Sequence, residues 1–567
     1  MNKECLAFPG NTQELVEACV SFCGSNKERM TEQHIRENRA RLSGFAEIFH
    51  KECGTYLPSV QKRIEDLRNG VGVVLMTAHQ PNLFAYSGVF RKVALNFFLA
   101  KKLEDRLGVP VVNFFGIADQ DFTDDRWVRS CQLPAVQRSG GALSIEIDLP
   151  RKLMLNMVAK PPLGLLKKWR AEVEKWLDDA VESVKRLSKA TGVSGMCSTP
   201  CVSTLEENLV SFWSLIEDCY ERSKKYSDFN AFVMSKIVND LWGYDTVFVR
   251  FSECQQALAD RFRFLLSRFE DYSELLKRAT EIPCGTGVGG GVSDQEHLLV
   301  PFWYHCNCGS KVKLFLMEKD EVLVGRGNCV GCQEYYELDF GSKDDPDISG
   351  IASRISARAI PMALVFFNGL LPSCYVGGTG GVGYLQDAFY VARNLGIPFP
   401  PVAVWRPHDK YLGIGQAEAM LELRRICRDY GAKDLFTAKE SLELRLSEIQ
   451  ASLSRLGKIE EKISARLKEN PGDRQLEERR RKTSMRRSRM IKSSNLSVIA
   501  HELKTIENIS AVSGLIPSII DYLVNVGLKR TSDLWIRHLN EDGNLSSDVD
   551  LDSVLGQSVE LGVPSVP

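Results

Sequence analysis

The fold is decided by residues 71–121, where the apolar run Val71-Gly-Val-Val-Leu-Met-Thr-Ala78 leads into the polar turn His79-Gln-Pro-Asn82. A second apolar run, 109–118, ends in another polar turn, Asp119-Gln-Asp121. Short apolar runs rich in β-branched residues are typical of strands that are buried on both faces. The segment between the two runs has apolar residues at helical spacing. Strand, helix and strand in this order predict a βαβ unit with parallel strands.

The same pattern returns much later in the chain. Further apolar runs of strand length are found at 246–251, 363–367, 374–377 and 402–405. Together with the first unit they predict an α/β fold, with a doubly wound, Rossmann-like core that is interrupted by insertions.

The predicted organisation has eight segments. Three of them, 71–139, 241–283 and 346–436, form the core, and an N-terminal helical segment covers 1–70. The other four are a mostly helical insertion at 140–240, a cysteine-containing insertion at 284–345 that opens with the flexible glycine-rich stretch 285–291, an antiparallel coiled-coil hairpin at 437–510, and a C-terminal helix with a flexible tail at 511–567. We expect the tail to fray from Asn540 onward.

Composition excludes several classes of protein. Of the 567 residues, 44% are hydrophobic and 26% are charged, which is typical of a globular chain rather than a disordered one. The formal net charge of −1 does not favour nucleic acid as a partner, although a local basic patch leaves that class open. The N-terminus does not resemble a secretory signal, and no apolar run is long enough to span a membrane. With sixteen scattered cysteines, a reducing cytoplasmic location is expected.

The polar turns that follow the strands are the first candidate site. Ligands of parallel sheets bind at the carboxyl ends of the strands, so we expect both turns to contribute. His79 is a candidate acid, base or phosphate-binding donor, and Gln80 and Asn82 follow it. Asp119 and Asp121 are candidates for holding an amine, a ribose hydroxyl or Mg²⁺. The alternative is that these residues only cap turns and helices.

A glycine-rich turn after the 374–377 run is the second candidate. Glycines without side chains allow backbone N–H groups to approach a phosphate closely. The nucleotide-binding candidates are Gly377, Gly378, Gly380, Gly381 and Gly383, together with His79 and Asn82. An NAD site is less favoured than an ATP-like one, because the acidic residue expected about 20 residues later is placed too far away, at Asp409.

Four cysteines form the most specific local motif. Cys306 and Cys308 are followed, after a gap of twenty residues, by Cys329 and Cys332. Two closely spaced pairs at this separation predict a tetrahedral Zn²⁺ site. Because four thiolates leave no open position, the zinc is expected to be structural. His305 is interpreted as a neighbour of the site rather than a ligand.

The predicted hairpin carries an apolar seam at alternating steps of four and three residues, with one polar position at Glu460, and this pattern is typical of a coiled coil. The seam consists of Leu442, Leu446, Ile449, Leu453, Leu456, Ile463 and Leu467. The segment 470–473, Asn-Pro-Gly-Asp, interrupts it. A basic run that follows, 479–489, is interpreted as a solvated face that pairs with glutamates of the first helix.

At this point the motifs resemble a known family, the cysteine-adding enzymes of bacillithiol biosynthesis (BshC). The similar stretches are Thr77-Ala-His-Gln-Pro-Asn-Leu83, the acidic turn 119–122, and Leu371-Pro-Ser-Cys-Tyr-Val-Gly-Gly-Thr-Gly-Gly-Val-Gly-Tyr384 with the later 396–401. The resemblance implies a core related to class I aminoacyl-tRNA synthetases and a coiled coil that pairs two protomers into a homodimer. It also implies an ATP-like nucleotide site, for ATP or ADP, and amide formation between cysteine and an amino-sugar malate conjugate.

Two positions depart from the family pattern. Gln120 stands where the family has His, and Gly381 stands where its glycine turn ends in Glu; the zinc ribbon is also an addition. A ligase of the BshC type, with His79, Gln80, Asp119 and Asp121 in its active site, is therefore the leading hypothesis. The alternative is a catalytically silent, zinc-containing protein that binds RNA or a protein partner. A third hypothesis, an NAD(P)-dependent oxidoreductase, rests on the glycine pattern alone.

Overall fold

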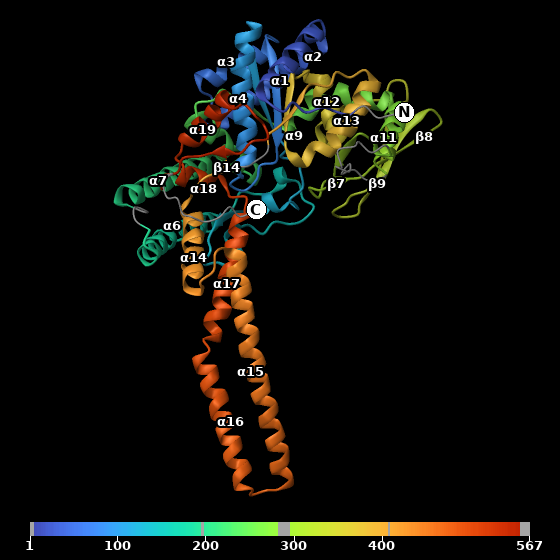
Figure 1. The fold of residues 1–567 in the computed structure, drawn as a ribbon. Coiled ribbons are helices and arrows are strands. Elements are labelled where there is room, and N and C mark those ends of the chain that lie inside the picture. The colour runs from blue at the N-terminus through green and yellow to red at the C-terminus, as the bar shows by residue number, and fades with distance from the viewer. Residues whose placement is uncertain (1–4, 194–197, 282–294, 406–408, 556–567) are drawn as a thin grey trace.

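The computed structural model describes residues 5–193, 198–281, 295–405 and 409–555. A five-stranded parallel sheet forms its centre, in the order β13-β12-β1-β2-β5 (Figure 1). The strands are β1 (Val73–His79), β2 (Val111–Ile117), β5 (Val247–Arg250), β12 (Cys374–Gly377) and β13 (Val402–Val404). The prediction of a mixed α/β fold with a parallel sheet is confirmed. The predicted glycine-rich opening of the second insertion, 285–291, lies outside the described residues.

The order of the strands contains one reversal. From β1 the chain adds β2 and then β5 on one side, and it later adds β12 and β13 on the other side of β1. The direction in which the sheet grows therefore changes between β1 and β12. In parallel sheets this is the place where neighbouring loops diverge and leave room for a ligand.

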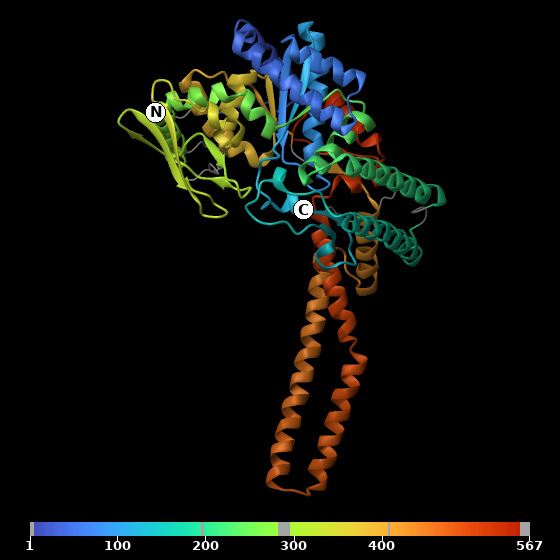
Figure 2. The same ribbon diagram turned by 180° about the vertical axis from the view of Figure 1, so that it is seen from behind.

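Helices cover both faces of the sheet (Figure 1, Figure 2). Side chains of a strand point alternately to opposite faces, so Val73 and Leu75 belong to one buried cluster and Val74 and Met76 to the other. On the first face lie α1 (Thr12–Ser25) and α4 (Ser87–Leu107). The helices of the second face are α2 (Gln33–Cys53), α3 (Pro58–Arg68), α9 (Phe251–Ala257), α10 (Ala259–Ser267), α11 (Phe269–Glu281), α12 (Ala359–Leu370) and α13 (Val382–Leu395).

One predicted strand is wrong. The run 363–367 lies inside α12, whose residues are buried almost all round. A short, continuous apolar run does not distinguish a buried strand from a buried helix, since periodicity is absent in both. After β5, the next strand of this sheet along the chain is therefore β12, which pairs with β1 on the side opposite to β2.

The first inserted segment, 140–240, is mostly helical in the structure. A short helix, α5 (Arg126–Arg129), precedes it, and a β-hairpin of β3 (Ser130–Pro134) and β4 (Ala142–Glu146) leads into it. Its helices are α6 (Leu163–Thr191), α7 (Thr199–Arg222), α8 (Tyr226–Ser235) and a π-helical turn (Lys236–Leu241). Trp169 and Trp213 are fully buried and join this segment to the core of the first sheet face.

The segment with the four cysteines, which we call the cysteine module, consists of residues 295–357. It contains two small antiparallel sheets, in the orders β11-β6-β7 and β10-β9-β8. The strands are β6 (Phe302–His305), β7 (Lys311–Val312), β8 (Phe315–Lys319), β9 (Val322–Asn328), β10 (Tyr335–Ser342) and β11 (Ile355–Ala357). Asp320 and Glu321 form the tight turn between β8 and β9, both with positive φ.

A long helix pair projects from the body, as the sequence predicts (Figure 1). The first helix, α15 (Leu435–Glu469), packs against α16 (Arg474–Ser493) and α17 (Leu496–Ser513). The second arm is therefore two helices, because Asn495 adopts the left-handed conformation with φ of 49° and ends α16. Arg487 pairs with Glu460 across the hairpin at 3.2 Å, while α16 itself buries no residue.

The prediction that the chain frays from Asn540 is wrong for residues 540–555. Leu545 and Leu551 are buried in the core, and β15 (Val549–Asp550) pairs with β14 (Asp409–Lys410). The other C-terminal helices are α14 (Ile414–Tyr430), α18 (Ile519–Asn525) and α19 (Arg530–Glu541). Among the described residues, no helix combines the length and apolar character that crossing a membrane requires.

Candidate active site and metal centre

A cavity of about 600 Å³ opens at the carboxyl edge of the sheet, where the strand order reverses. We call it the carboxyl-edge cavity. Three turns that the sequence singled out line it together: the turn after β1, the turn after β2 and the glycine turn after β12. These segments are up to 300 residues apart in the chain, and parallel pairing of β1 with β2 and β12 brings their ends to one edge.

His79 is the last residue of β1 and lines the cavity. Its Nδ1 lies 3.0 Å from the carbonyl oxygen of Gln80. Since a carbonyl can only accept, Nδ1 carries the proton and Nε2 keeps a lone pair, with the Tyr86 hydroxyl 3.4 Å away. Burial, together with the positive charge of Lys92, lowers the pKa of His79 to about 3. The imidazole is thus neutral at physiological pH and presents an acceptor rather than a donor.

The two aspartates of the acidic turn, Asp119 and Asp121, lie in different surroundings. Asp119 is 1% exposed and does not line the cavity; its carboxylate accepts from the backbone N–H and the hydroxyl of Ser252, at the start of α9. Burial raises the pKa of Asp119 to about 6. Asp121 does line the cavity, and it accepts a hydrogen bond of 3.0 Å from the side chain of Gln80. Of the two predicted acids, only Asp121 is therefore placed to contact a ligand directly.

Two buried amides line the same cavity without satisfying their polar atoms. Asn82 is 2% exposed, and neither its Nδ2 nor its Oδ1 has a partner among the described residues. Gln120 leaves its Oε1 unpartnered in the same way. A buried polar atom without a hydrogen bond costs about 1–3 kcal/mol. Such atoms at a cavity wall indicate that a polar ligand completes them.

The glycine turn forms the third wall. Gly378, Gly380 and Gly381 line the cavity, whereas Gly377 ends β12 and Gly383 is buried in the first turn of α13. The N-terminus of α13 follows directly, and backbone N–H groups of a helix start favour anions. A Cβ at Gly378 would lie 3.3 Å from the Lys92 ammonium, while one at Gly380 would meet nothing within 4 Å. The open space beside Gly380 belongs to the cavity.

Sequence reasoning missed several of the lining residues. Lys92 lies on the buried face of α4, 8% exposed, and burial lowers its pKa to about 8. A lysine among the apolar residues of a helix was a signal that could have marked it. The other missed residues are aromatic or basic and come from distant segments: Tyr86, Trp127, Trp303, Lys311, Arg358, Tyr375 and Tyr384.

The four predicted cysteine ligands meet in the cysteine module. Their sulfur atoms all lie within 4.8 Å of one another, and the Cys306–Cys332 and Cys308–Cys329 pairs are each 3.5 Å apart. Tetrahedral thiolates with bonds of about 2.3 Å to Zn²⁺ would be about 3.8 Å apart, so this arrangement can hold a metal ion. Tyr336 approaches the Cys306 sulfur at 3.2 Å. His305 is not part of the cluster.

The chain matches no protein-family model, and no curated protein matches its sequence.

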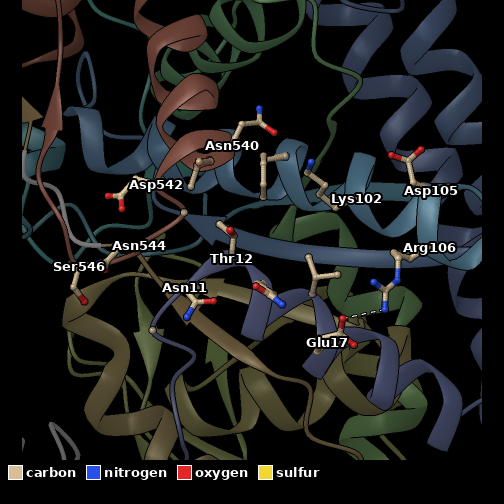
Figure 3. Close-up of a pocket in the computed structure, with 16 residues that line it drawn as sticks. Asn11, Thr12, Glu17, Lys102, Asp105, Arg106, Asn540, Asp542, Asn544 and Ser546 are labelled. Carbon is tan, nitrogen blue, oxygen red and sulfur yellow. Dashed lines mark hydrogen bonds and ion pairs between the residues drawn. The ribbon is translucent and has the colours of Figure 1, made fainter.

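A second and larger hollow, of about 960 Å³, lies between α1, α4 and the segment that ends α19 (Figure 3). The last turns of α4 return to the start of β2, and Lys102 and Arg106 on those turns line this amino-edge hollow. Glu17 pairs with Arg106 at 2.9 Å, and both side chains are 54% exposed. Among the described residues that line it, none has a buried polar side-chain atom without a partner. Size alone does not mark it as a binding site.

Proposed function

We propose that the protein is a ligase that joins the activated carboxyl group of an amino acid to the amine of a small molecule. The supporting observation is that the turns containing His79, Asp121 and Gly380 line one cavity at the reversal of strand order. The resemblance to the BshC family suggests cysteine as the amino acid and an amino-sugar malate conjugate as the acceptor.

The glycine turn and Lys92 are suited to bind the phosphates of ATP or ADP. In chain order the strands are arranged 3-2-1-4-5, the arrangement of Rossmann-like sheets, which bind nucleotides at this edge. When bound, ATP would supply the phosphate that activates the carboxyl group. Backbone N–H groups at 378–381 and the Lys92 ammonium would then stabilise negative charge that develops on phosphate oxygens.

The other side of the cavity would hold the amine. Asp121 can accept a hydrogen bond from it, in place of the one that Gln80 donates in this structure. The lone pair on His79 Nε2 can accept a hydrogen bond from the amine and orient its nitrogen toward the carboxyl carbon. The departing phosphate can take the proton that the amine loses. Asp119 would act indirectly, because it holds the start of α9 through Ser252.

Zinc, homodimerisation and a reducing compartment complete the proposal. The four sulfurs suit a structural Zn²⁺, whose closed coordination leaves no place for a substrate. Apolar side chains remain exposed on the projecting hairpin, Leu444 by 64% and Ile459 by 41%, which supports a second protomer as the partner. No disulfide joins the described cysteines, which supports a reducing compartment such as the cytoplasm.

The His79→Ala variant tests the ligase. We expect ligation of cysteine to the amino-sugar malate conjugate, with ATP present, to fall by about 100-fold or more. ADP affinity, measured by fluorescence titration, and the free energy of unfolding should stay near their original values. His501→Ala, which changes an exposed histidine of α17, is the matched control. Because the pKa of His79 is lowered to about 3, its titration should be absent from the rate profile between about pH 5 and about pH 9.

An unchanged rate in His79→Ala would remove this residue from the mechanism, and a wild-type protein that does not bind ADP would remove the nucleotide site. ADP binding without ligation would instead favour the silent binding protein, which Gly381 and the absence of buried residues in α16 also support. In that case RNA binding should weaken steeply with salt, and further when Arg486→Ala and Arg487→Ala are combined.

A further inference from the structure

The cysteine module contributes one wall of the carboxyl-edge cavity. Its sheet β11-β6-β7 pairs Trp303 with Ser356 and His305 with Lys311. Side chains of directly paired residues, and of residues two apart on a strand, share a face. Trp303, Lys311 and Arg358, which follows β11 in the same alternation, therefore lie on one face and line the cavity. The opposite face, with Phe302 and Val312, belongs to the hydrophobic core.

Lys311 is a buried cation without a partner. The residue is 3% exposed, and its ammonium makes no hydrogen bond or ion pair within the described part of the chain. Its Nζ lies 5.0 Å from the ring centre of Phe122 and 6.0 Å from that of Trp303. Asp121 lines the same cavity and favours the charged form of Lys311, yet burial outweighs this and lowers the pKa of the lysine to about 8.

Arg358 provides a second unpaired donor. The residue is 7% exposed, and Glu296 accepts from its Nε and Nη2, the latter at 2.5 Å. This bidentate pair, together with the Trp303 ring 4.1 Å from the guanidinium carbon, holds the side chain in place. The remaining nitrogen, Nη1, is buried and has no hydrogen-bond partner among the described residues.

A buried cationic group whose hydrogen-bond donors lack partners costs free energy that an anionic ligand can recover. We propose that Lys311 Nζ and Arg358 Nη1 form a subsite for an oxyanion, the carboxylate or phosphate group of a molecule bound in the carboxyl-edge cavity. This inference rests on the proposed function only in placing a ligand in that cavity. A metal ion bound by the four cysteines would stabilise this subsite, because Cys306 and Cys308 lie in the turn between Trp303 and Lys311.

The test uses the full-length, zinc-loaded protein and two probes, succinate for a carboxylate and inorganic phosphate. Thermal unfolding is followed with and without an excess of each probe. At least one probe should raise the Tm of the wild-type protein, and the probe that does so identifies the oxyanion. Lys311→Met should lose this rise, which corresponds to an affinity lower by about tenfold or more. Lys313→Met is the matched control, since Lys313 is two residues away and lies over the Phe315 ring instead.

A second readout separates a binding role from a structural one. Without any probe, Lys311→Met should have a Tm equal to or above that of the wild-type protein, because the variant no longer buries an unpaired charge. Lys311→Arg, which keeps a cation, should restore the rise in Tm with the probe. The subsite is refuted if neither probe stabilises the wild type, if Lys311→Met responds like the wild type, or if its Tm falls sharply without probe. Probe binding that depends on Lys311 in a protein that does not bind ADP would refute the proposed ligase and leave the subsite standing.

Discussion

The carboxyl-edge cavity lies where the strands of the parallel sheet end, whereas the amino-edge hollow lies between α1, α4 and the end of α19. The amino-edge hollow is larger, about 960 Å³ against about 600 Å³. Its charged side chains are exposed, and two of them, Glu17 and Arg106, pair with each other. In the carboxyl-edge cavity, Asn82 and Arg358 keep buried polar atoms without a partner among the described residues, and Lys311 is 3% exposed. The difference teaches that unpaired buried polarity is a better indicator of a ligand site than volume, because a fold retains such atoms only at a cost in stability.

The largest effect is expected from loss of the metal, which should abolish ligand binding in the carboxyl-edge cavity. In Cys329→Ser we expect the zinc content to fall from about one ion per chain to none, and the free energy of unfolding to fall by more than about 3 kcal/mol. The wall that carries Trp303 and Lys311 would lose its anchor, so ligand binding in the carboxyl-edge cavity should be lost too. Metal analysis, urea unfolding and ADP titration measure the three effects.

Cys427→Ser is the control for this variant, because Cys427 is a half-buried thiol of α14 outside the cluster. It should keep its metal and its ADP affinity. A Cys329→Ser protein that still binds one zinc ion would contradict the four-thiolate site.

The next largest effect is expected from one methyl group added to the glycine turn of the carboxyl-edge cavity. In Gly380→Ala the new Cβ meets no atom of the protein within 4 Å, so stability should change by no more than about 1 kcal/mol. The methyl group would occupy the space next to the backbone that a phosphate approaches, and ADP affinity should fall by about tenfold or more. Gly350→Ala, which is equally free of contacts but outside the cavity, should bind ADP like the wild type. Unchanged affinity in Gly380→Ala would move the phosphates away from the glycine turn.

The smallest effect is expected at the amino edge. Arg106→Ala removes an exposed ion pair with Glu17, and such pairs contribute about 1 kcal/mol or less. Ligation and ADP affinity should be unaffected, and urea unfolding should show a correspondingly small loss. A large loss of activity in this variant would reverse the ranking of the two hollows.

Much of the fold could be predicted from local sequence. Both buried runs of the first unit are strands, and the helix between them ends at Gly108, in the left-handed conformation with φ of 66°. The run 363–367 was assigned to the wrong element because burial on all sides removes the periodicity that separates helix from strand. The segment 540–555 looks polar and mobile in sequence, but Leu545 and Leu551 pack into a core that other parts of the chain supply.

The sequence by itself determined the parallel strands, the cysteine pairs and the polar turns that end the strands, since each depends on residue types a few positions apart. Only the tertiary structure decided which side chains face the cavity. It gave Asp119 to the start of α9 and Asp121 to the cavity, and it brought Lys311 of the cysteine module and Arg358, which follows that module, to the same wall. Whether a charge is paired, buried or open to a ligand depends on neighbours hundreds of residues away, and no local pattern records them.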